Sequence, residues 1–342
     1  MSRIRHAAPD WALDSVQMAA VFAQLHFGYR NRRTVSGGPC SCLTPISAGI
    51  LLISIAAIMS QAHAQTIALP SATSTVTLQS LSPGSTTFDA SVGTMINAST
   101  GDGVDGNNAQ NWVFTNHGSI TGASLGISLS SATLNGLTLD NFSSIQCKTA
   151  QGVLLTNGGQ LTNHAGATIA GALDAVSVIG AGSSVSNDGF VTTGSNSSAG
   201  VYFAAGGSFT QSAAGTVGTN GGTGYGVVFN TGGVAGTNAG MVYGASATYA
   251  FWARGAATGT FSNSGTFSAG TGAVLASNGV TLTNTGTITG TGGTAVSLTG
   301  SGNTLVLGTG SALNGSVAST GTNNVLTLQG SGSADNRRCR TA

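Results

Sequence analysis

Charge is scarce in this 342-residue chain, which contains no glutamate and a single lysine, Lys148; only 6% of its residues are charged. Half of the ten basic residues are arginines that lie between Arg3 and Arg33. From residue 65 onward, seven aspartates against Lys148 and four arginines leave a net charge of −2. Neutralising a phosphate backbone requires clustered Lys and Arg. The composition therefore excludes nucleic acid as an expected partner.

Cysteine is also rare, with four residues in the chain. Cys40 and Cys42 lie in the amino-terminal leader, and Cys147 and Cys339 are far apart in the sequence. A disulfide requires α-carbons within about 7 Å of each other, and none of the four shows the paired spacing of a structural zinc site. We expect no disulfide, no metal and no cofactor.

What the chain does contain is a repeat, typified by LTNTGTITG at residues 282–290. An apolar strand residue, an Asn, a Gly-containing turn and a second short apolar run recur back to residue 114. Successive anchors are separated by 25, 22, 24, 24, 27, 25 and 21 residues. The anchors are Asn116, Asn141, Asn163, Asn187, Gln211, Asn238, Asn263 and Asn284.

Two further phrases recur between the anchors, such as GVYF (200–203) and GGQLTN (158–163), so each cycle holds about three short strands. Glutamate is absent and Lys148 is the only lysine, while Gly, Thr, Ser, Val and Asn are abundant, which disfavours a helical repeat. A propeller blade needs about 40–50 residues. The repeat therefore predicts an all-β parallel β-helix of about 9–11 coils, stacked about 4.8 Å apart.

The anchor residues have two interpretations. Asn tolerates the left-handed backbone region of a tight turn, its side chain can cap local N–H groups, and stacked amides form hydrogen-bonded ladders. The alternative is a polar surface that binds a ligand. We favour the turn and ladder.

The chain divides into four segments. Residues 1–64 combine a basic region, an apolar run at 46–59 and the small-residue sequence AHA, which predicts a long signal peptide cleaved before Gln65. A start at Met18 and a twin-arginine signal are alternatives for this leader. Residues 65–110 are predicted to form an amino-terminal cap and the first coils, because a solenoid end needs a cover. Residues 111–336 hold the repeats, and 337–342 (RRCRTA) form an aberrant tail.

The acidic residues offer weak candidates for chemistry. Asp102 and Asp105 lie in GDGVDGNN, which lacks the ligand order and distal Glu of a calcium loop. Asp140, Asp174 and Asp188 fall at different phases of the repeat, so we do not expect them to line one groove as catalytic carboxylates. We predict no catalytic residue and no enzyme activity.

Other polar and aromatic residues carry less specific signals. His117 and His164 both follow an anchor, two coils apart, at about 10 Å, which is too far to share a metal. Arg254 is the only Arg between residue 65 and the tail, and we expect it to be solvated. Aromatic residues concentrate in 200–252, where strand alternation directs one of each neighbouring pair outward. An outward stripe would suit stacking on sugars; the alternative, which we favour, is interior Phe with surface Tyr.

The TNxGxITG-like phrases, with GNTLVLGTGSALNGSV (302–317) and NNVLTLQGSGSADN (323–336), resemble the passenger region of autotransporter (type V secretion) proteins of Gram-negative bacteria. The resemblance covers about 110–336 well and 65–110 loosely. It implies a right-handed parallel β-helix that is exported and shown on the cell surface, with adhesion, autoaggregation and immune interaction as common roles. It carries over no catalytic residue.

The tail departs from that family, in which an apolar strand and an outer-membrane barrel of about twelve strands would follow; RRCRTA indicates a truncated or frameshifted gene. The leading hypothesis is an adhesin-like or structural passenger. The alternatives are a carbohydrate-active β-helix enzyme and a substrate of a separate two-partner secretion barrel. The candidate partners are a host surface or a second copy of the chain. The expected location is the cell surface or outer membrane if a barrel is supplied, and otherwise the periplasm.

Overall fold

The computed structural model describes residues 66–81, 86–107, 110–195, 198–218, 224–245 and 248–329. The chain divides into two units, residues 1–59 and 60–342, and all described residues lie in the second. The predicted signal peptide and the tail at 337–342 lie outside the described residues.

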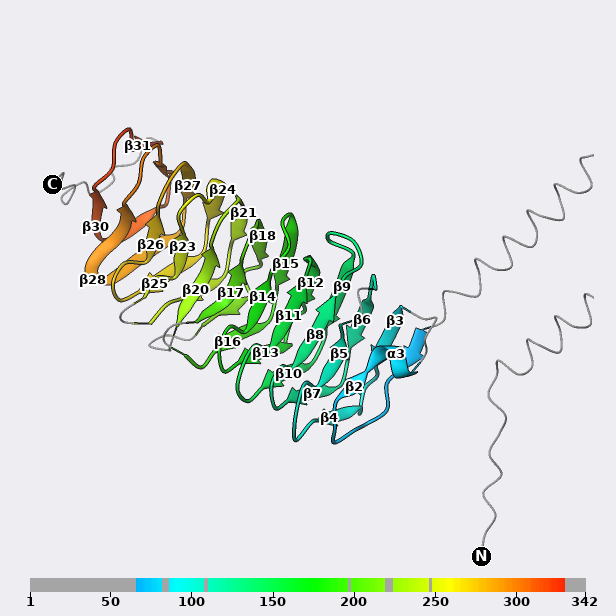
Figure 1. Ribbon diagram of the computed structural model, residues 1–342. Helices are drawn as coiled ribbons and strands as arrows, with labels where there is room; N and C mark the ends of the chain where they lie inside the picture. Colours follow the sequence, from blue (N-terminus) through cyan, green and yellow to red (C-terminus); the bar gives the residue numbers. More distant parts are fainter. Residues whose placement is uncertain are drawn as a thin grey trace, which may run out of the picture. The chain divides into compact units, whose positions relative to one another are not determined.

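The described residues form a parallel β-solenoid of about ten turns, with one short helix, α3 (Leu78–Leu81) (Figure 1). Strand pairs between successive coils are parallel and in register. This confirms the predicted all-β parallel β-helix and its coil number, while its handedness stays a prediction. Within the described ranges, no helix is long and apolar enough to cross a membrane.

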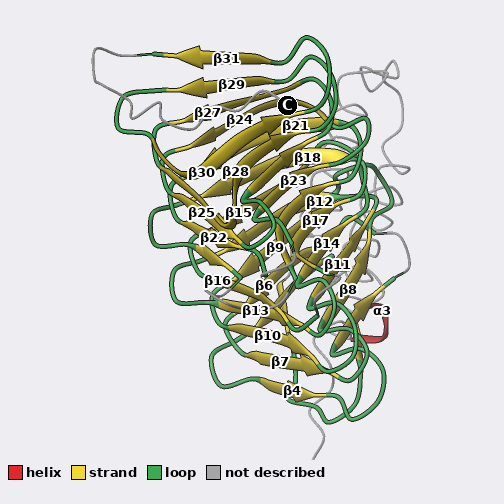
Figure 2. Ribbon diagram, turned by 90° about the vertical axis from the view of Figure 1, so that its left-hand side faces the viewer, coloured by secondary structure: helices red, strands yellow, loops and turns green. Residues whose placement is uncertain are grey.

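The first strand of each coil belongs to a 12-stranded sheet, which ends in β31 (Figure 2). In eight of these strands the last residue is a repeat anchor. The strands of this sheet are β1 (Thr66–Ala68), β3 (Thr87–Ala90), β6 (Val113–Asn116), β9 (Leu137–Asn141), β12 (Gly159–Asn163), β15 (Ser183–Asn187), β18 (Gly206–Gln211), β21 (Gly233–Asn238), β24 (Thr258–Asn263), β27 (Val280–Asn284), β29 (Thr304–Leu307) and β31 (Val325–Leu328).

The second strand of each coil follows the anchor after a short turn. It corresponds to the second apolar run of the repeat phrase, such as SITG after Asn116. The strands of this column are β4 (Met95–Asn97), β7 (Ser119–Gly122), β10 (Ser144–Cys147), β13 (Thr168–Gly171), β16 (Phe190–Thr193), β19 (Thr216–Val217), β22 (Met241–Tyr243) and β25 (Thr266–Ala269).

The third strand of each coil comes from the GVYF-like phrase. Near the carboxyl end of the stack, β28 (Thr287–Leu298) and β30 (Ala312–Ser319) run through the second and third columns without a break. The other strands of the third column are β2 (Val76–Thr77), β5 (Val104–Gly106), β8 (Ile127–Ser130), β11 (Val153–Thr156), β14 (Val176–Val178), β17 (Ala199–Phe203), β20 (Tyr225–Phe229), β23 (Phe251–Ala253) and β26 (Val274–Ala276).

The described residues before Trp112 use the same three columns as the repeats. β3 pairs with β6, β4 with β7, and β5 with β8, all in parallel. The Trp112 indole packs against Phe88 with ring centroids 5.7 Å apart and donates a hydrogen bond to the Gly106 carbonyl oxygen. The first coils are thus continuous with the rest of the stack.

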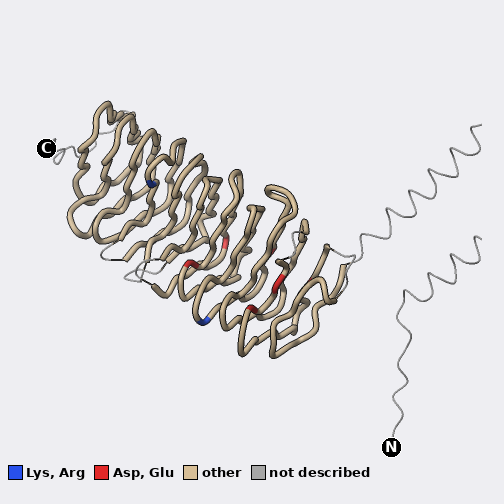
Figure 3. Tube along the Cα trace, in the orientation of Figure 1, with Lys and Arg blue, Asp and Glu red and all other residues tan. Residues whose placement is uncertain are grey.

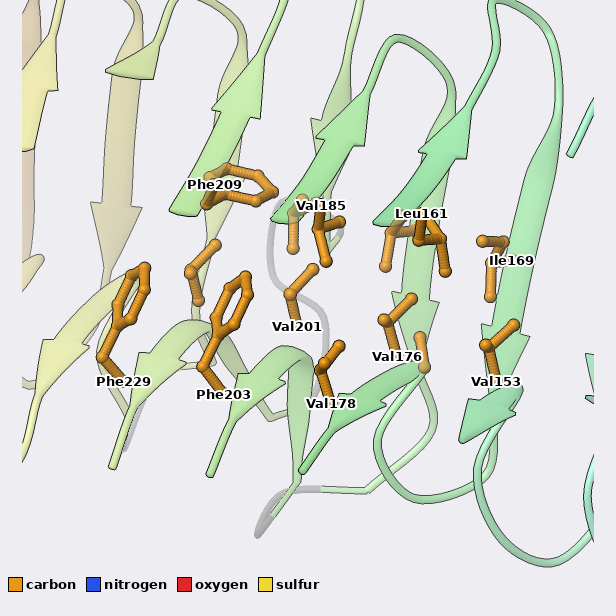
Figure 4. Close-up of a cluster of buried hydrophobic side chains, with 14 of the residues drawn as sticks. Val153, Leu161, Ile169, Val176, Val178, Val185, Val201, Phe203, Phe209 and Phe229 are labelled. Carbon is orange, nitrogen blue, oxygen red and sulfur yellow. The ribbon is translucent and has the colours of Figure 1, made fainter. Parts of the chain in front are cut away.

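The core is a column of apolar side chains from all three strands of every coil, since alternate residues of each strand point inward. In the coils that hold Val153, Leu161 and Val178 these residues are Ile, Val and Leu, whereas Phe203, Phe209 and Phe229 occupy the same columns further along (Figure 4). The Phe203 and Phe229 rings stack at 4.6 Å and 3°. Similar side chains therefore stack on each other in successive coils, and the apolar core is continuous along the solenoid.

At the inward register position of Phe209 and Phe261, the coil between them has a glycine. Gly236 pairs with Phe209 on one side and with Phe261 on the other. Two strand spacings amount to about 9.6 Å, yet the two rings stack with centroids 6.5 Å apart. The rings therefore lean toward each other across Gly236.

Candidate functional site

The eight anchors form one continuous column of side-chain amides. Each amide nitrogen donates to the amide oxygen of the next coil over distances of 2.7–3.0 Å, from Asn116 to Asn284. Gln211 takes part through its Oε1 and Nε2 atoms, so its longer side chain does not interrupt the column. The column ends where the register position becomes Ala90 on one side and Leu307 on the other.

All eight anchor residues are buried, the most exposed being Gln211 at 1%. Their amide groups also bond to the adjoining turn: Asn116 and Asn238 each accept from the backbone N–H two residues later. The anchors do not adopt the left-handed backbone that asparagine tolerates. Among described non-glycine residues, positive φ occurs at Asn135, Asn157 and Asn323 instead, because the anchors end extended strands. Buried amides that bond to each other do not offer a polar surface to a ligand.

The carboxylates of the described coils are dispersed (Figure 3). Asp102 accepts a hydrogen bond from the Leu125 N–H, and Asp174 accepts one from the Ala199 N–H at 2.7 Å. Burial raises the pKa of both carboxyls; the hydrogen bonds oppose that rise, and the charge of Asp105 adds to it at Asp102. Asp140 lies elsewhere, 3.2 Å from the Nε2 atom of His164.

The two histidines share one edge but do not meet. The Phe142 ring lies between them, stacked on His117 at 4.6 Å and on His164 at 3.8 Å. Each imidazole also contacts a carboxylate: His117 contacts Asp89 at 3.1 Å, and His164 contacts Asp140. Within the described part of the chain, no group of three or more His, Cys, Asp or Glu could hold a metal ion.

The aromatic pairs alternate as strand geometry requires. Phe203 and Phe251 are fully buried, whereas their neighbours Tyr202 and Trp252 are half-buried on the outer surface of the third column. Val228 separates Tyr202 from Trp252 in register and is itself 3% exposed. Interior Phe and outward Tyr and Trp thus coexist in the same coils.

Trp252 is the centre of an outward cluster. Its ring lies 4.9 Å from Tyr225 and 5.5 Å from Tyr249, and the two Tyr rings stack at 6.4 Å. The Arg254 guanidinium lies over the indole, 4.5 Å from the ring centroid, a cation–π geometry. Burial raises the pKa of the Tyr249 phenol, and Tyr225 raises it further. We call Tyr202, Tyr225, Tyr249, Trp252 and Arg254 the aromatic patch.

Two of these contacts have a signal in the sequence that the spacing of the anchors alone does not show. Phe142 follows an anchor directly, as His117 and His164 do. The three rings therefore occupy the same position in successive coils, which predicts that they stack. Arg254 stands two residues after Trp252, and residues two apart share a face of a strand. Arg254 is exposed, as expected, and its guanidinium also lies over the indole.

No family model, curated protein or solved structure matches the chain.

Proposed function

We propose that this chain is an exported, non-enzymatic β-solenoid passenger with an adhesin-like or structural role. The observation that carries the proposal is the in-register parallel β-solenoid, which begins directly after the leader-like sequence of residues 1–64. A buried amide ladder and a continuous apolar core stabilise an elongated fold, which presents a long surface rather than a single cleft. Such a surface suits display and adhesion.

The arrangement of acidic groups supports a non-enzymatic role. Hydrolysis or elimination on a polysaccharide requires two or more carboxylates at working distance from one bond. Asp102 and Asp174 are each occupied by a backbone N–H of the following coil, and Asp89 and Asp140 each contact a histidine. None of these four contacts joins one carboxylate to another.

Export is tested with the full chain, tagged within an exposed turn and expressed in a Gram-negative host. We expect a mature chain that begins at Gln65, recovered outside the cytoplasm, and surface exposure to added protease when a translocator barrel accompanies the chain. Deleting residues 46–59 should retain the chain in the cytoplasm. An uncleaved, cytoplasmic full-length chain would contradict the proposal.

A further inference from the structure

Three residues of the aromatic patch, Tyr202, Tyr225 and Trp252, lie on regular strands with fixed register. Tyr249 and Arg254 lie just before and just after β23. Trp252 pairs with Val228 in one neighbouring coil and Leu275 in the other, and both aliphatic residues are buried although they belong to the outward column. Tyr202 lies one coil beyond Val228, about 10 Å from Trp252 at two strand spacings. The backbone positions of Tyr202, Tyr225 and Trp252 are therefore fixed before any ligand arrives, which lowers the entropic cost of binding.

The patch carries the only charge among the described residues that follow Asp188. Arg254 is the single charged residue between Asp188 and Asp335 in the sequence. The ion pairs found among the described residues join His117 with Asp89 and His164 with Asp140, so Arg254 takes part in neither. Its guanidinium is stacked on Trp252, which leaves N–H groups at its edge for a carboxylate or similar planar anion.

We propose that the aromatic patch binds a glycan that contains carboxylated sugars. Its rings match the apolar C–H face of a pyranose, and Arg254 matches the carboxylate of a uronic or sialic acid. Trp, Tyr and Arg are the residues that most often dominate binding energy at interfaces. The proposal rests on the proposed function, because an exported rod meets glycans outside the cell.

The number of cations at the patch distinguishes a carboxylated glycan from other polymers that stack on aromatic rings. Single-stranded nucleic acid requires a positively charged groove that follows its backbone. Here a single arginine stands in a stretch of the chain without another cation from Phe190 to Asn336. One cation beside a group of rings suits a ligand with few, spaced negative charges and apolar faces between them.

The test is calorimetry with the purified full chain and a panel of carboxylated glycans: polygalacturonate, alginate, hyaluronate and polysialic acid. Methyl-esterified polygalacturonate and poly-glutamate serve as the neutral-sugar and the acidic-peptide comparisons. We expect saturable binding to at least one carboxylated glycan and weaker binding to both comparisons. Trp252→Ala should lower the affinity for that glycan about tenfold or more, which is ~1.4 kcal/mol or above.

Arg254→Gln is expected to remove the preference for the acidic over the esterified polymer, because only the carboxylate contact is lost. The matched controls are Lys148→Gln, the other cation of the described coils, and Phe142→Ala, an aromatic residue that is 44% exposed on a different surface. Both controls should bind like the parent chain. If Trp252→Ala does not fold, as judged by its melting temperature, Arg254→Gln carries the test alone.

Three results would overturn the proposal: no saturable binding to any carboxylated glycan, equal binding to poly-glutamate, or equal losses in Arg254→Gln and Lys148→Gln. Because calorimetry uses purified protein, its failure is independent of whether the chain is exported. A chain that reaches the cell surface and binds no glycan would leave the proposed function standing and remove the glycan site.

Discussion

The side-chain amide of Asn163 donates to the amide oxygen of Asn187 at 2.8 Å, although the two residues are 24 positions apart in the chain and both are fully buried. The same Asn163 accepts from Asn141 on its other side. Each amide thus supplies a hydrogen-bond partner to the amides of the neighbouring coils. A buried polar group without such a partner costs about 1–3 kcal/mol of folding free energy. The ladder therefore makes adjacent coils depend on each other.

Asn163→Leu should lower the unfolding free energy by about 2–4 kcal/mol, because it breaks two ladder bonds and leaves buried partners unpaired. Thermal and denaturant unfolding measure the loss. The matched control is Asn284→Leu at the end of the ladder, where one ladder bond is broken and the next register partner is already Leu307. Equal losses at both positions, or none at Asn163, would contradict the ladder's contribution.

Gly236→Ala should destabilise the fold strongly. Gly236 has φ of +141°, and an added Cβ would approach the Phe209 carbonyl oxygen to within 1.8 Å. Relieving that clash requires moving the Phe209 backbone, for which we expect about 3 kcal/mol or more. Its control lies in the same strand: Gly233 has no neighbouring atom within 4 Å of an added Cβ. Gly233→Ala should melt within a few degrees of the parent chain, and similar melting of both variants would refute the close packing at Gly236.

Asp174→Asn should raise stability at neutral pH. Burial raises the pKa of Asp174 in the folded chain, so the folded state holds the proton more tightly than the unfolded state does. Stability at this site is therefore greatest below the unfolded pKa of about 3.9 and falls as pH rises through the folded value. Asn is neutral and keeps an oxygen that can accept from the Ala199 N–H.

Melting temperatures of the parent chain and the Asp174→Asn variant, taken from pH 3 to pH 8, measure this effect. The advantage of the variant should shrink as the pH falls toward about 4. The pKa of Asp102 is also raised by folding, but its contribution to the pH dependence of stability is the same in both proteins. A variant that is less stable than the parent at pH 7 would show that the carboxylate is favoured in the folded state.

Strand positions and coil number were predictable from the sequence because the anchors hold one register position in a parallel stack. Asn141, Asn163 and Asn187 align residue for residue in the first sheet, so spacing in the chain maps onto coils. Inward and outward aromatic residues followed from strand alternation, as Phe203 and Tyr202 show. Periodic local patterns carry this information directly.

Contacts between side chains of different coils were harder to predict. The inward position of Gly236 is filled from the coils on both sides, and no local pattern indicates that Phe209 and Phe261 lean toward each other. The cation–π contact of Arg254 likewise depends on the direction that a long, flexible side chain takes. The continuous strand β28 arises where a turn between two columns is replaced by extended backbone with irregular register.

Disulfide cross-linking tests the in-register parallel stack most directly. Thr162 pairs with Ser186, and Ser186 with Thr210, on the outer side of the first sheet. In a chain whose native cysteines are replaced by serine, Thr162→Cys with Ser186→Cys should form a disulfide, since adjacent strands lie about 4.8 Å apart. Thr162→Cys with Thr210→Cys, two spacings apart, should not. Ready oxidation of the 162–210 pair, or none of the 162–186 pair, would contradict the stacked-coil architecture.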